Sequence, residues 1–296
     1  MFSETLMSQV RNLSGAFLGG QTPLKNAIRI LIKKMDHSRS YVRLVDSMGT
    51  DSAIVQAARV SYGAGTKSVS DDRALIRYLM RHKHNTPFEM VEFKFHIRAP
   101  IYVARQWLRH RTASVNEVSA RYSVIPDEYF LPDELRVQSN ARGQGGEEPF
   151  GDGGSNLLAK QKASCDFAFH VYDELIEKGA SRELARAHLP QCTFTEFYWK
   201  IDLHNLLHFL ALRMDDHAQK EIRDLAVQVY DCIKTIVPVT CEAFEDFRLG
   251  SVTLSRIELA HIRDIIRDPM SAKWRVIPGK GENQEFQEKL KLLGLA

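Results

Sequence analysis

The chain has 296 residues, of which 44% are hydrophobic and 26% are charged, and its formal net charge is +3 at pH 7. This composition is typical of a soluble globular protein with room for a substantial core. The small net charge excludes a strong overall field for nucleic acid, so any site for an anion must be local.

The cysteines argue against metal and disulfide chemistry. The four of them, Cys165, Cys192, Cys232 and Cys241, lie far apart and form no CxxC or Cys/His ligand pattern. We therefore expect reduced thiols, a cytoplasmic location and no resident metal. No apolar run is long enough to span a bilayer, and the N-terminus does not resemble a secretion signal, so no membrane partner is expected.

Hydrophobic periodicity predicts the elements in the first half of the chain. After an extension over residues 1–40, which could form two short helices, we expect a strand over 41–45, helices over 51–59 and 71–82, a strand over 90–98 and a helix over 100–109. Pro87 ends the second helix region, because proline cannot continue a helix, and Pro100 suits the first turn of the third helix. The segment that follows this helix is expected to be a polar loop.

The second half of the chain also has patterns that predict helices and strands. They are a glycine-rich surface insertion over 138–156, a helix over 157–178, a short helix from Ser181 to Pro190, a strand over 193–201, and helices over 202–213, 216–237 and 256–267. The insertion lacks a phosphate-binding GxGxxG or GxxxxGK order, so a mobile linker is the expected structure. Asp202 is placed to cap its helix, and Ser255 and Glu258 form a capping-box pattern. We expect an α/β (α+β) fold, a single mixed domain with a central sheet flanked by helices and with helical N- and C-terminal extensions.

Residues 105–122, which read RQWLRHRTASVNEVSARY, concentrate charge unusually. Four arginines stand against a single acid, Glu117, and hydroxyl and amide side chains lie between them. Guanidinium groups stay protonated and bind phosphate or carboxylate oxygens in pairs. The segment therefore indicates a site for an anionic ligand that has a planar polar edge. The alternative is a surface helix end with scattered arginines.

The order RHRTASVNEVSARY fits the signature RHRxxSxNExSxRY at nine positions, and the chain resembles the flavin-dependent thymidylate synthases over about residues 41–249. The resemblance implies the thymidylate synthase-complementing protein fold, with a catalytic domain over 41–250 between extensions over 1–40 and 251–296. It also implies reductive methylation of dUMP to dTMP, with methylenetetrahydrofolate as one-carbon donor and FAD, reduced by NADPH, as hydride source. A homotetramer with sites shared between subunits is implied as well.

The same resemblance implies the site residues, position by position. The expected dUMP contacts are Gln106, Arg109, Glu117, Ser119, Ala120, Arg121, Arg186 and Arg213. The expected FAD contacts are Thr86, Arg109, His110, Arg111, Glu117, Asp202, His204 and His208. Arg213 is the expected catalytic residue, because a guanidinium can stabilise negative charge on the uracil N3–C4=O edge and so activate C5. A cysteine nucleophile is then not needed.

Other interpretations of these residues remain open. The arginine cluster could belong to a nucleic-acid-binding module, although the near-neutral charge and Glu117 argue against it. The chain could also be a catalytically inactive relative. His204 and His208 alone would suggest core histidines or a metal pair, and His217 and Glu221 would suggest a structural pair on one helix.

Overall fold

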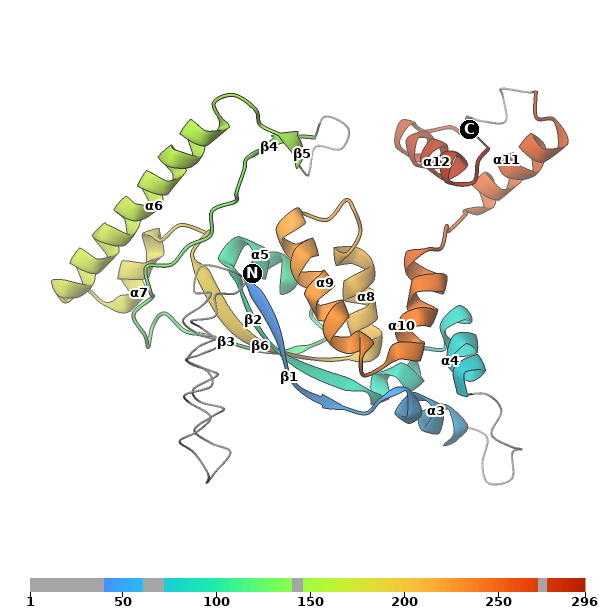
Figure 1. Ribbon diagram of the computed structural model, residues 1–296, viewed down its shortest axis with the longest axis horizontal. Coiled ribbons are helices and arrows are strands. Elements are labelled where there is room, and N and C mark those ends of the chain that lie inside the picture. The colour runs from blue at the N-terminus through green and yellow to red at the C-terminus, as the bar shows by residue number, and fades with distance from the viewer. Residues whose placement is uncertain (1–39, 61–71, 140–145, 271–275, 296) are drawn as a thin grey trace, which may run out of the picture. The chain divides into compact units, whose positions relative to one another are not determined.

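The computed structural model describes residues 40–60, 72–139, 146–270 and 276–295 (Figure 1). These residues form two compact units, and each unit is built from two stretches of the chain. The sheet unit lies within Met1–Gly49 and Phe88–Ile233, and the helical unit lies within Thr50–Pro87 and Lys234–Ala296. The helices expected in residues 1–40 lie outside the described residues. The domain boundaries expected at residues 40 and 250 stay predictions.

The sheet unit is organised around a four-stranded antiparallel sheet in the order β1-β2-β6-β3. Its strands are β1 (Tyr41–Met48), β2 (Glu92–Pro100), β6 (Phe194–Asp202) and β3 (Ser114–Glu117). The two central strands pair along their whole length, from Glu92 opposite Asp202 to Pro100 opposite Phe194. Strands were expected at three of these places, and the register of the central pair decides which side chains share a face.

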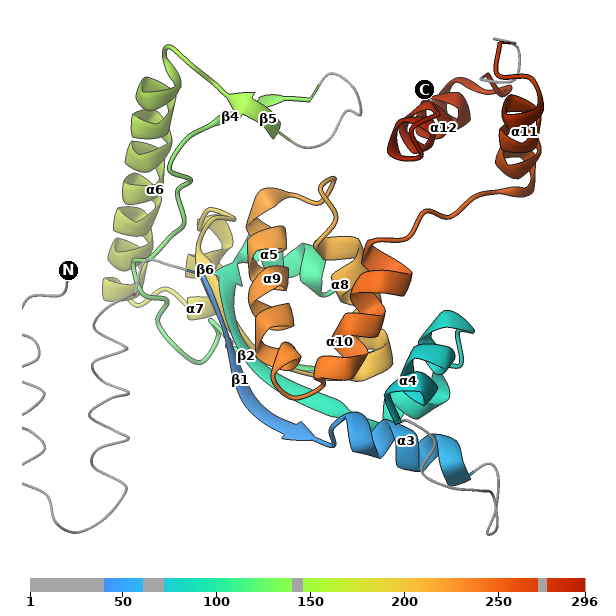
Figure 2. The same cartoon turned by 45° about the vertical axis from the view of Figure 1, so that its right-hand side comes forward.

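Alternation in the two central strands builds the core. Phe95 lies opposite Trp199 in the register, and both are fully buried on one face of the sheet. Three helices cover this face in both views, namely α5 (Ile101–Trp107), α8 (Leu203–Arg213) and α9 (Lys220–Lys234) (Figures 1 and 2). The Trp107 ring lies 5.2 Å from the Trp199 ring and 4.5 Å from the Phe209 ring. The expected architecture, a central sheet flanked by helices, is confirmed.

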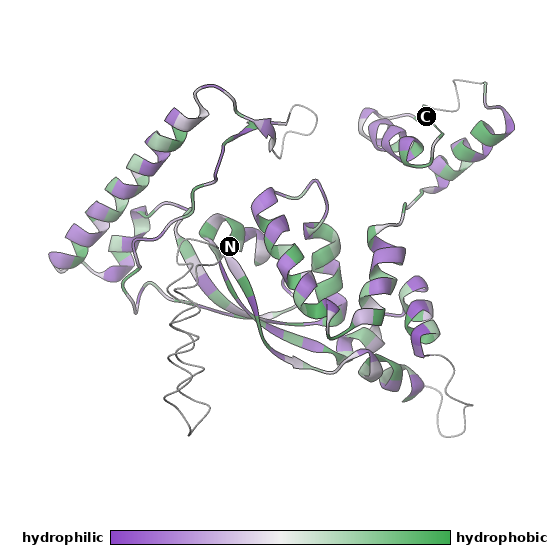
Figure 3. Ribbon diagram, in the orientation of Figure 1, coloured by the Kyte–Doolittle hydropathy of each residue, from purple (hydrophilic) through white to green (hydrophobic). Residues whose placement is uncertain are grey.

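A peripheral part of the sheet unit connects β3 to β6. It comprises β4 (Arg136–Gln138), β5 (Gly146–Pro149), α6 (Gly154–Glu177), α7 (Arg182–Ala185) and the 3-10 turn η2 (Arg186–His188). Polar and apolar residues alternate along α6 (Figure 3). Its buried Phe169 and Tyr172 pack with Ala185 of α7 in a small separate core. Gly179, with φ of 82°, follows the end of α6 as predicted, because this backbone conformation favours glycine.

Three sequence predictions in the sheet unit are wrong in detail. The segment Ser114–Glu117 is a strand rather than a loop, because it pairs with the edge of β6. The predicted insertion contains strand β5, which pairs with β4, while residues 140–145 lie outside the described residues. Helix α9 begins at Lys220 rather than at Asp216, so His217 precedes the helix.

The helical unit contains α3 (Asp51–Val60), α4 (Asp72–Arg81), α10 (Pro238–Phe244), the π-helical turn η3 (Glu245–Leu249) and the 3-10 turn η1 (Thr86–Met90), which continues into the sheet unit. The Asp51 carboxylate accepts hydrogen bonds from the backbone N–H groups of Val239 and Thr240 at 2.9 and 3.1 Å, which ties α3 to the start of α10. Arg77 of α4 contacts Glu242 and Asp246 at 2.6 and 2.7 Å. Charged pairs thus join helices that are distant in sequence.

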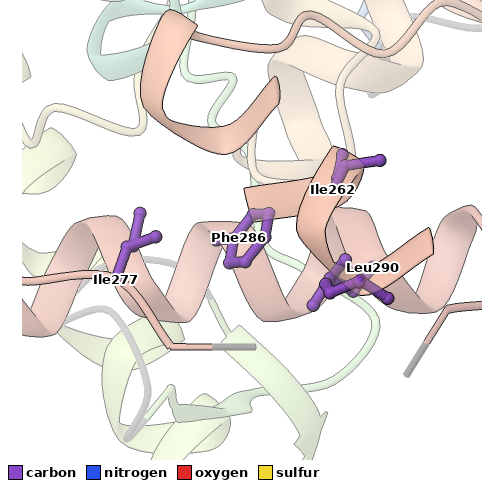
Figure 4. Packing of buried hydrophobic residues seen from close by; sticks show 5 residues of the cluster. Ile262, Ile277, Phe286 and Leu290 are labelled. Carbon is purple, nitrogen blue, oxygen red and sulfur yellow. The ribbon is translucent and has the colours of Figure 1, made fainter. Parts of the chain in front are cut away.

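The unit ends with a helix pair, α11 (Arg256–Arg267) and α12 (Lys280–Leu292). The predicted capping box is confirmed, since the Ser255 and Glu258 side chains each accept from the other's backbone N–H. Ile262, Phe286 and Leu290 are buried where the helices meet (Figure 4). The expected helical C-terminal extension therefore has a small hydrophobic core of its own.

Candidate active site

Two clefts lie in the sheet unit and share two side chains, Gln106 of α5 and Arg213 at the end of α8. The first cleft, of about 580 Å³, is also lined by Arg136, Gln219 and Glu221. The second, of about 610 Å³, runs along the end of α5 and the exposed side of α8. Because Gln106 and Arg213 line both, a ligand in either cleft would meet them.

The second cleft gathers six of the fourteen residues that the sequence nominated. Its predicted site residues are Gln106, Arg109, His110, Arg111, His208 and Arg213. The lining residues that the structure describes include three arginines and no acid. Such a surface favours an anionic ligand with several phosphate or carboxylate oxygens.

The contact between Arg213 and His110 fixes the guanidinium in this cleft. Arg213 donates a hydrogen bond from Nε to Nε2 of His110 over 3.1 Å. The His110 ring lies edge-on to Phe209, with ring centres 4.9 Å apart. Since Nε is used by His110, both terminal nitrogens of Arg213 remain to donate to a planar ligand edge.

Burial and the neighbouring cation keep His110 neutral. Burial first, and then the charges of Arg213 and His208, together lower the pKa of His110 from 6.5 to about 4. A neutral ring whose Nε2 accepts a hydrogen bond carries its proton on Nδ1. Burial also lowers the pKa of Arg213, and the charge of Arg109 adds to this effect. Arg213 nevertheless stays protonated, because a guanidinium does not lose its proton in the physiological range.

Gln106 belongs to a chain of hydrogen bonds along the wall of the first cleft. Its Nε2 donates to Oε1 of Gln219 at 2.5 Å, and Nε2 of Gln219 donates to Oε2 of Glu221 at 2.8 Å. Arg136 of β4 donates to the other Glu221 oxygen at 2.7 Å. Of this chain, only Gln106 was expected at the site. The expected pairing of Glu221 with His217 is wrong, because His217 pairs with Asp215 before α9 begins.

A second group of predicted residues lies at the end of β3 and in the loop after it, and it lines neither of the two clefts described above; it consists of Glu117, Ser119, Ala120 and Arg121. Glu117 accepts a hydrogen bond from the Thr195 hydroxyl at 2.5 Å. The Ser119 hydroxyl accepts from the backbone N–H of Arg121 at 3.3 Å and from its Nε at 3.4 Å. The exposed Arg121 guanidinium lies 5.3 Å from the centre of the Tyr122 ring. This loop therefore presents the Ser119 hydroxyl and the Arg121 guanidinium on the surface of the sheet unit.

The remaining predicted residues lie in three other places. Arg186 is exposed on η2. Asp202 caps α8 as predicted, since its carboxylate accepts from the backbone N–H of Asn205 at 3.0 Å and from the Asn205 amide at 2.7 Å. His204 is half-buried in the first turn of α8, and it is not among the lining of the second cleft. Thr86 is exposed and belongs to the helical unit, at the start of η1.

The structure adds residues that sequence reasoning missed. Asn205 and Thr112 line the second cleft, and Arg136, Gln219 and Glu221 line the first. Gln219 and Glu221 stand close after Arg213 in the sequence, in the run RMDDHAQKE, and that proximity was the available signal. Arg136 offered none, because it reaches Glu221 only through the pairing of β4.

One cysteine also lines the first cleft. Cys192 lies 3.4 Å from Cys165, measured between sulfurs. Burial and then this neighbour raise the pKa of Cys192 to about 12, so its thiol is protonated and a poor nucleophile. Within the described residues, no three His, Cys, Asp or Glu side chains are grouped closely enough to hold a metal ion. The described helices include none that is long and apolar enough to cross a membrane.

Comparison with known proteins assigns the chain to a family. Residues 43–239 match the family described as thymidylate synthase complementing protein. A flavin-dependent thymidylate synthase of Dictyostelium discoideum is 51% identical over 272 residues, which cover 88% of this chain and 87% of the relative. One from Thermus thermophilus is 52% identical over 228 residues, which cover 77% of this chain and 84% of the relative.

A solved structure supports the same family assignment. The UMP/dUMP methylase PolB from Streptomyces cacaoi, bound with 5-Br dUMP, superposes with a TM-score of 0.65 at 36% sequence identity. The match covers 71% of this chain and 97% of PolB. A second PolB structure, bound with 5-Br UMP, has a TM-score of 0.61.

Proposed function

Because this chain belongs to the thymidylate synthase complementing protein family, which includes the flavin-dependent thymidylate synthases, we propose that it catalyses the reductive methylation of dUMP to dTMP. FAD is the cofactor, methylenetetrahydrofolate gives the one-carbon unit and NADPH is the reductant. The observation that carries the proposal is Arg213, which is held by His110 at the junction of two clefts. The solved relative PolB, which binds a dUMP analogue, supports dUMP as the substrate.

The residues of the second cleft fit a flavin dinucleotide. Two phosphates require cationic donors, and Arg109 and Arg111 provide them without an opposing acid in the lining. A planar ring system requires flat polar edges, which the His110 and His208 rings and the Asn205 amide offer. When bound, the flavin supplies the hydride, which removes the need for a redox group on the protein.

The protein's own contribution to catalysis is centred on Arg213. Its terminal nitrogens can donate to the C4=O oxygen of uracil and stabilise the negative charge that develops along the N3–C4=O edge. Charge delocalised through the ring makes C5 the nucleophile, so no enzyme cysteine has to add at C6. The protonated Cys192 thiol in the first cleft is consistent with a mechanism that uses no cysteine nucleophile.

The other nominated contacts retain their roles in the proposal. For dUMP these are Gln106, Arg109, Glu117, Ser119, Ala120, Arg121 and Arg186. For FAD they are Thr86, Arg109, His110, Arg111, Glu117, Asp202, His204 and His208. Asp202 is the weakest of these candidates, because both its oxygens already accept hydrogen bonds from Asn205. The cytoplasmic location also stays a prediction.

A homotetramer with shared sites explains how one dUMP could use both groups of residues. Arg213 lines the two clefts, whereas Ser119 and Arg121 are on the β3 loop and Arg186 is on η2, outside the lining of those clefts. We propose that the β3 loop of one subunit completes the cleft of another. Mixing Arg213→Gln protein with Arg121→Ala protein should then restore activity, because some mixed sites contain neither change.

Two measurements test the proposed activity. The purified protein should show the absorption of an oxidised flavin, which NADPH bleaches. It should release tritium from dUMP labelled at C5, with methylenetetrahydrofolate and NADPH present, and it should form dTMP. A colourless protein with no affinity for FAD would reject the proposal, and a flavoprotein that releases no tritium would indicate an inactive relative.

Substitution of Arg213 tests the mechanism. Arg213→Gln should retain the flavin and lower turnover by about 10²–10³-fold, the usual effect of removing one preorganised donor. Arg105→Gln is the matched control, because Arg105 is an exposed arginine on α5 that lines neither cleft. Normal turnover in Arg213→Gln would remove the proposed role at the uracil edge.

A further inference from the structure

The hydrogen-bond chain from Arg136 to Gln106 has a fixed direction. Glu221 is a carboxylate, which only accepts hydrogen bonds, and its side chain is 11% exposed. One of its oxygens accepts from Arg136, and the other accepts from Gln219. The Gln219 amide must therefore turn its NH₂ group toward Glu221, and its carbonyl oxygen toward Gln106.

The orientation of the Gln219 amide determines the orientation of the Gln106 amide. An amide side chain can usually be placed with its oxygen and nitrogen exchanged, but here the carboxylate at the far end decides the placement. Oε1 of Gln219 is an acceptor, so Gln106 must donate to it through Nε2. The group that Gln106 can then offer as an acceptor to a ligand is its own Oε1. Gln106 lines both clefts, beside Arg213.

We propose that Arg136, Glu221 and Gln219 are positioning residues that lock the Gln106 amide with its oxygen toward the substrate, so that Gln106 accepts a hydrogen bond from a donor group of dUMP. The inference rests on the proposed function, since it assigns a specific task to one of the expected dUMP contacts. dUMP carries two donors of suitable chemistry, the N3–H of uracil and the 3′-hydroxyl of deoxyribose. Arg213, which only donates, cannot recognise either of them as a donor.

The arrangement has a consequence for selectivity. An unlocked glutamine could turn over and offer NH₂ to a ligand acceptor, and it would then discriminate poorly between donor and acceptor edges. A locked glutamine rejects an acceptor in front of its Oε1, because two oxygen lone pairs would face each other there without a proton. A carboxylate two side chains away thus controls which hydrogen-bonding edge the cleft prefers.

The first experiment compares two carboxylate-to-amide changes on the same helix. Glu221→Gln removes the acceptor that orients the chain, and we expect the KM for dUMP to rise roughly tenfold while flavin content stays unchanged. Asp224→Asn is the matched control, because Asp224 lies in an exposed pair with Lys220 and lines neither cleft. An unchanged KM in Glu221→Gln would overturn the inference.

The second experiment separates positioning from simple structural support. In the background Gln106→Ala, the Glu221→Gln change should have no further effect on the KM for dUMP, because there is no amide left to orient. If the two changes are additive, Glu221 acts on the cleft in some other way and the inference is wrong. Flavin absorbance of each variant shows that the fold is intact.

Analogues of dUMP identify the donor. Inhibition by 2′,3′-dideoxyuridine monophosphate and by N3-methyl-dUMP is measured for the wild-type protein and for Gln106→Ala. The analogue that lacks the recognised donor should bind more weakly to the wild type, and this penalty should disappear in Gln106→Ala. If both penalties persist in Gln106→Ala, Gln106 accepts from neither group. Absence of dUMP turnover in the wild type would instead reject the proposed function itself, so the two failures are distinguishable.

Discussion

Protonation of His110 provides a quantitative test of the candidate site. Burial and the charge of Arg213 lower the pKa of His110 from 6.5 to about 4. The folded protein therefore binds this proton more weakly than the unfolded chain does. The stability that the neutral ring contributes is fully present above a pH of about 6.5, and it is lost as the pH falls toward about 4.

The size of the effect follows from the shift. Between about pH 7.5 and about pH 5, the two pKa values correspond to a loss of about 2 kcal/mol in the free energy of unfolding. The ring is only half-buried, so solvent screening should reduce this to about 1 kcal/mol. At low pH the protonated ring would also turn an N–H toward the Arg213 guanidinium, which replaces an attraction with a repulsion.

The matched variant is His110→Gln, which keeps an acceptor for Arg213 but cannot titrate in this range. Urea unfolding is followed by the fluorescence of Trp107 and Trp199, whose rings pack on Phe209, the residue that contacts His110. We expect the wild type to lose about 1 kcal/mol more than His110→Gln when the pH is lowered to about 5. Equal losses in the two proteins would refute the buried, neutral state assigned to His110.

Three further changes test the fold around the site. Asp202→Ala should lower stability by about 1 kcal/mol, measured by urea unfolding, because it removes the side-chain cap of α8; an unchanged midpoint would contradict this. Phe286→Ala should cost about 3–5 kcal/mol of the local stability of the α11–α12 pair, and hydrogen exchange should speed up in these two helices, not throughout the chain. Diamide should join Cys165 to Cys192, whose sulfurs lie 3.4 Å apart, but slowly, because burial keeps the Cys192 thiol protonated. Peptide mapping without reductant should find this link after prolonged treatment; only intermolecular links would show that the geometry is wrong.

The sequence predicted the elements that its local chemistry determines. The central strands show alternation, the start of α8 has an acid three residues before Asn205, and α11 begins with a capping box, so all three could be read from a few neighbouring residues. Strand β3 could not be predicted in this way, because Ser114–Glu117 has no apolar alternation and becomes a strand only by pairing with β6. The same reason explains Arg136, which enters the site through a pairing between β4 and β5.

The site residues also divide into those whose chemistry is local in the sequence and those whose role depends on the fold. The arginine-rich signature identified the second cleft, because a run of cationic and polar residues retains its chemistry wherever the chain places it. It could not reveal that His110 is neutral, because that depends on burial and on the approach of Arg213 from another helix. The signature also gave no role to Gln219 and Glu221, whose task depends on the direction of a hydrogen-bond chain.

The charge balance of the two clefts has a consequence for how the protein holds its ligands. The described lining of the second cleft contains Arg109, Arg111 and Arg213 without an acid, so these cations repel one another. Burial lowers the pKa of Arg213 most, and the charge of Arg109 adds to this effect. In the first cleft, by contrast, Glu221 balances Arg136. Phosphates bound in the second cleft would supply the missing negative charge, so a dinucleotide should stabilise the folded protein more than its contacts alone suggest. The neutral state of His110 fits this balance, because a fourth cation in the cleft would add repulsion without adding a donor for the uracil edge.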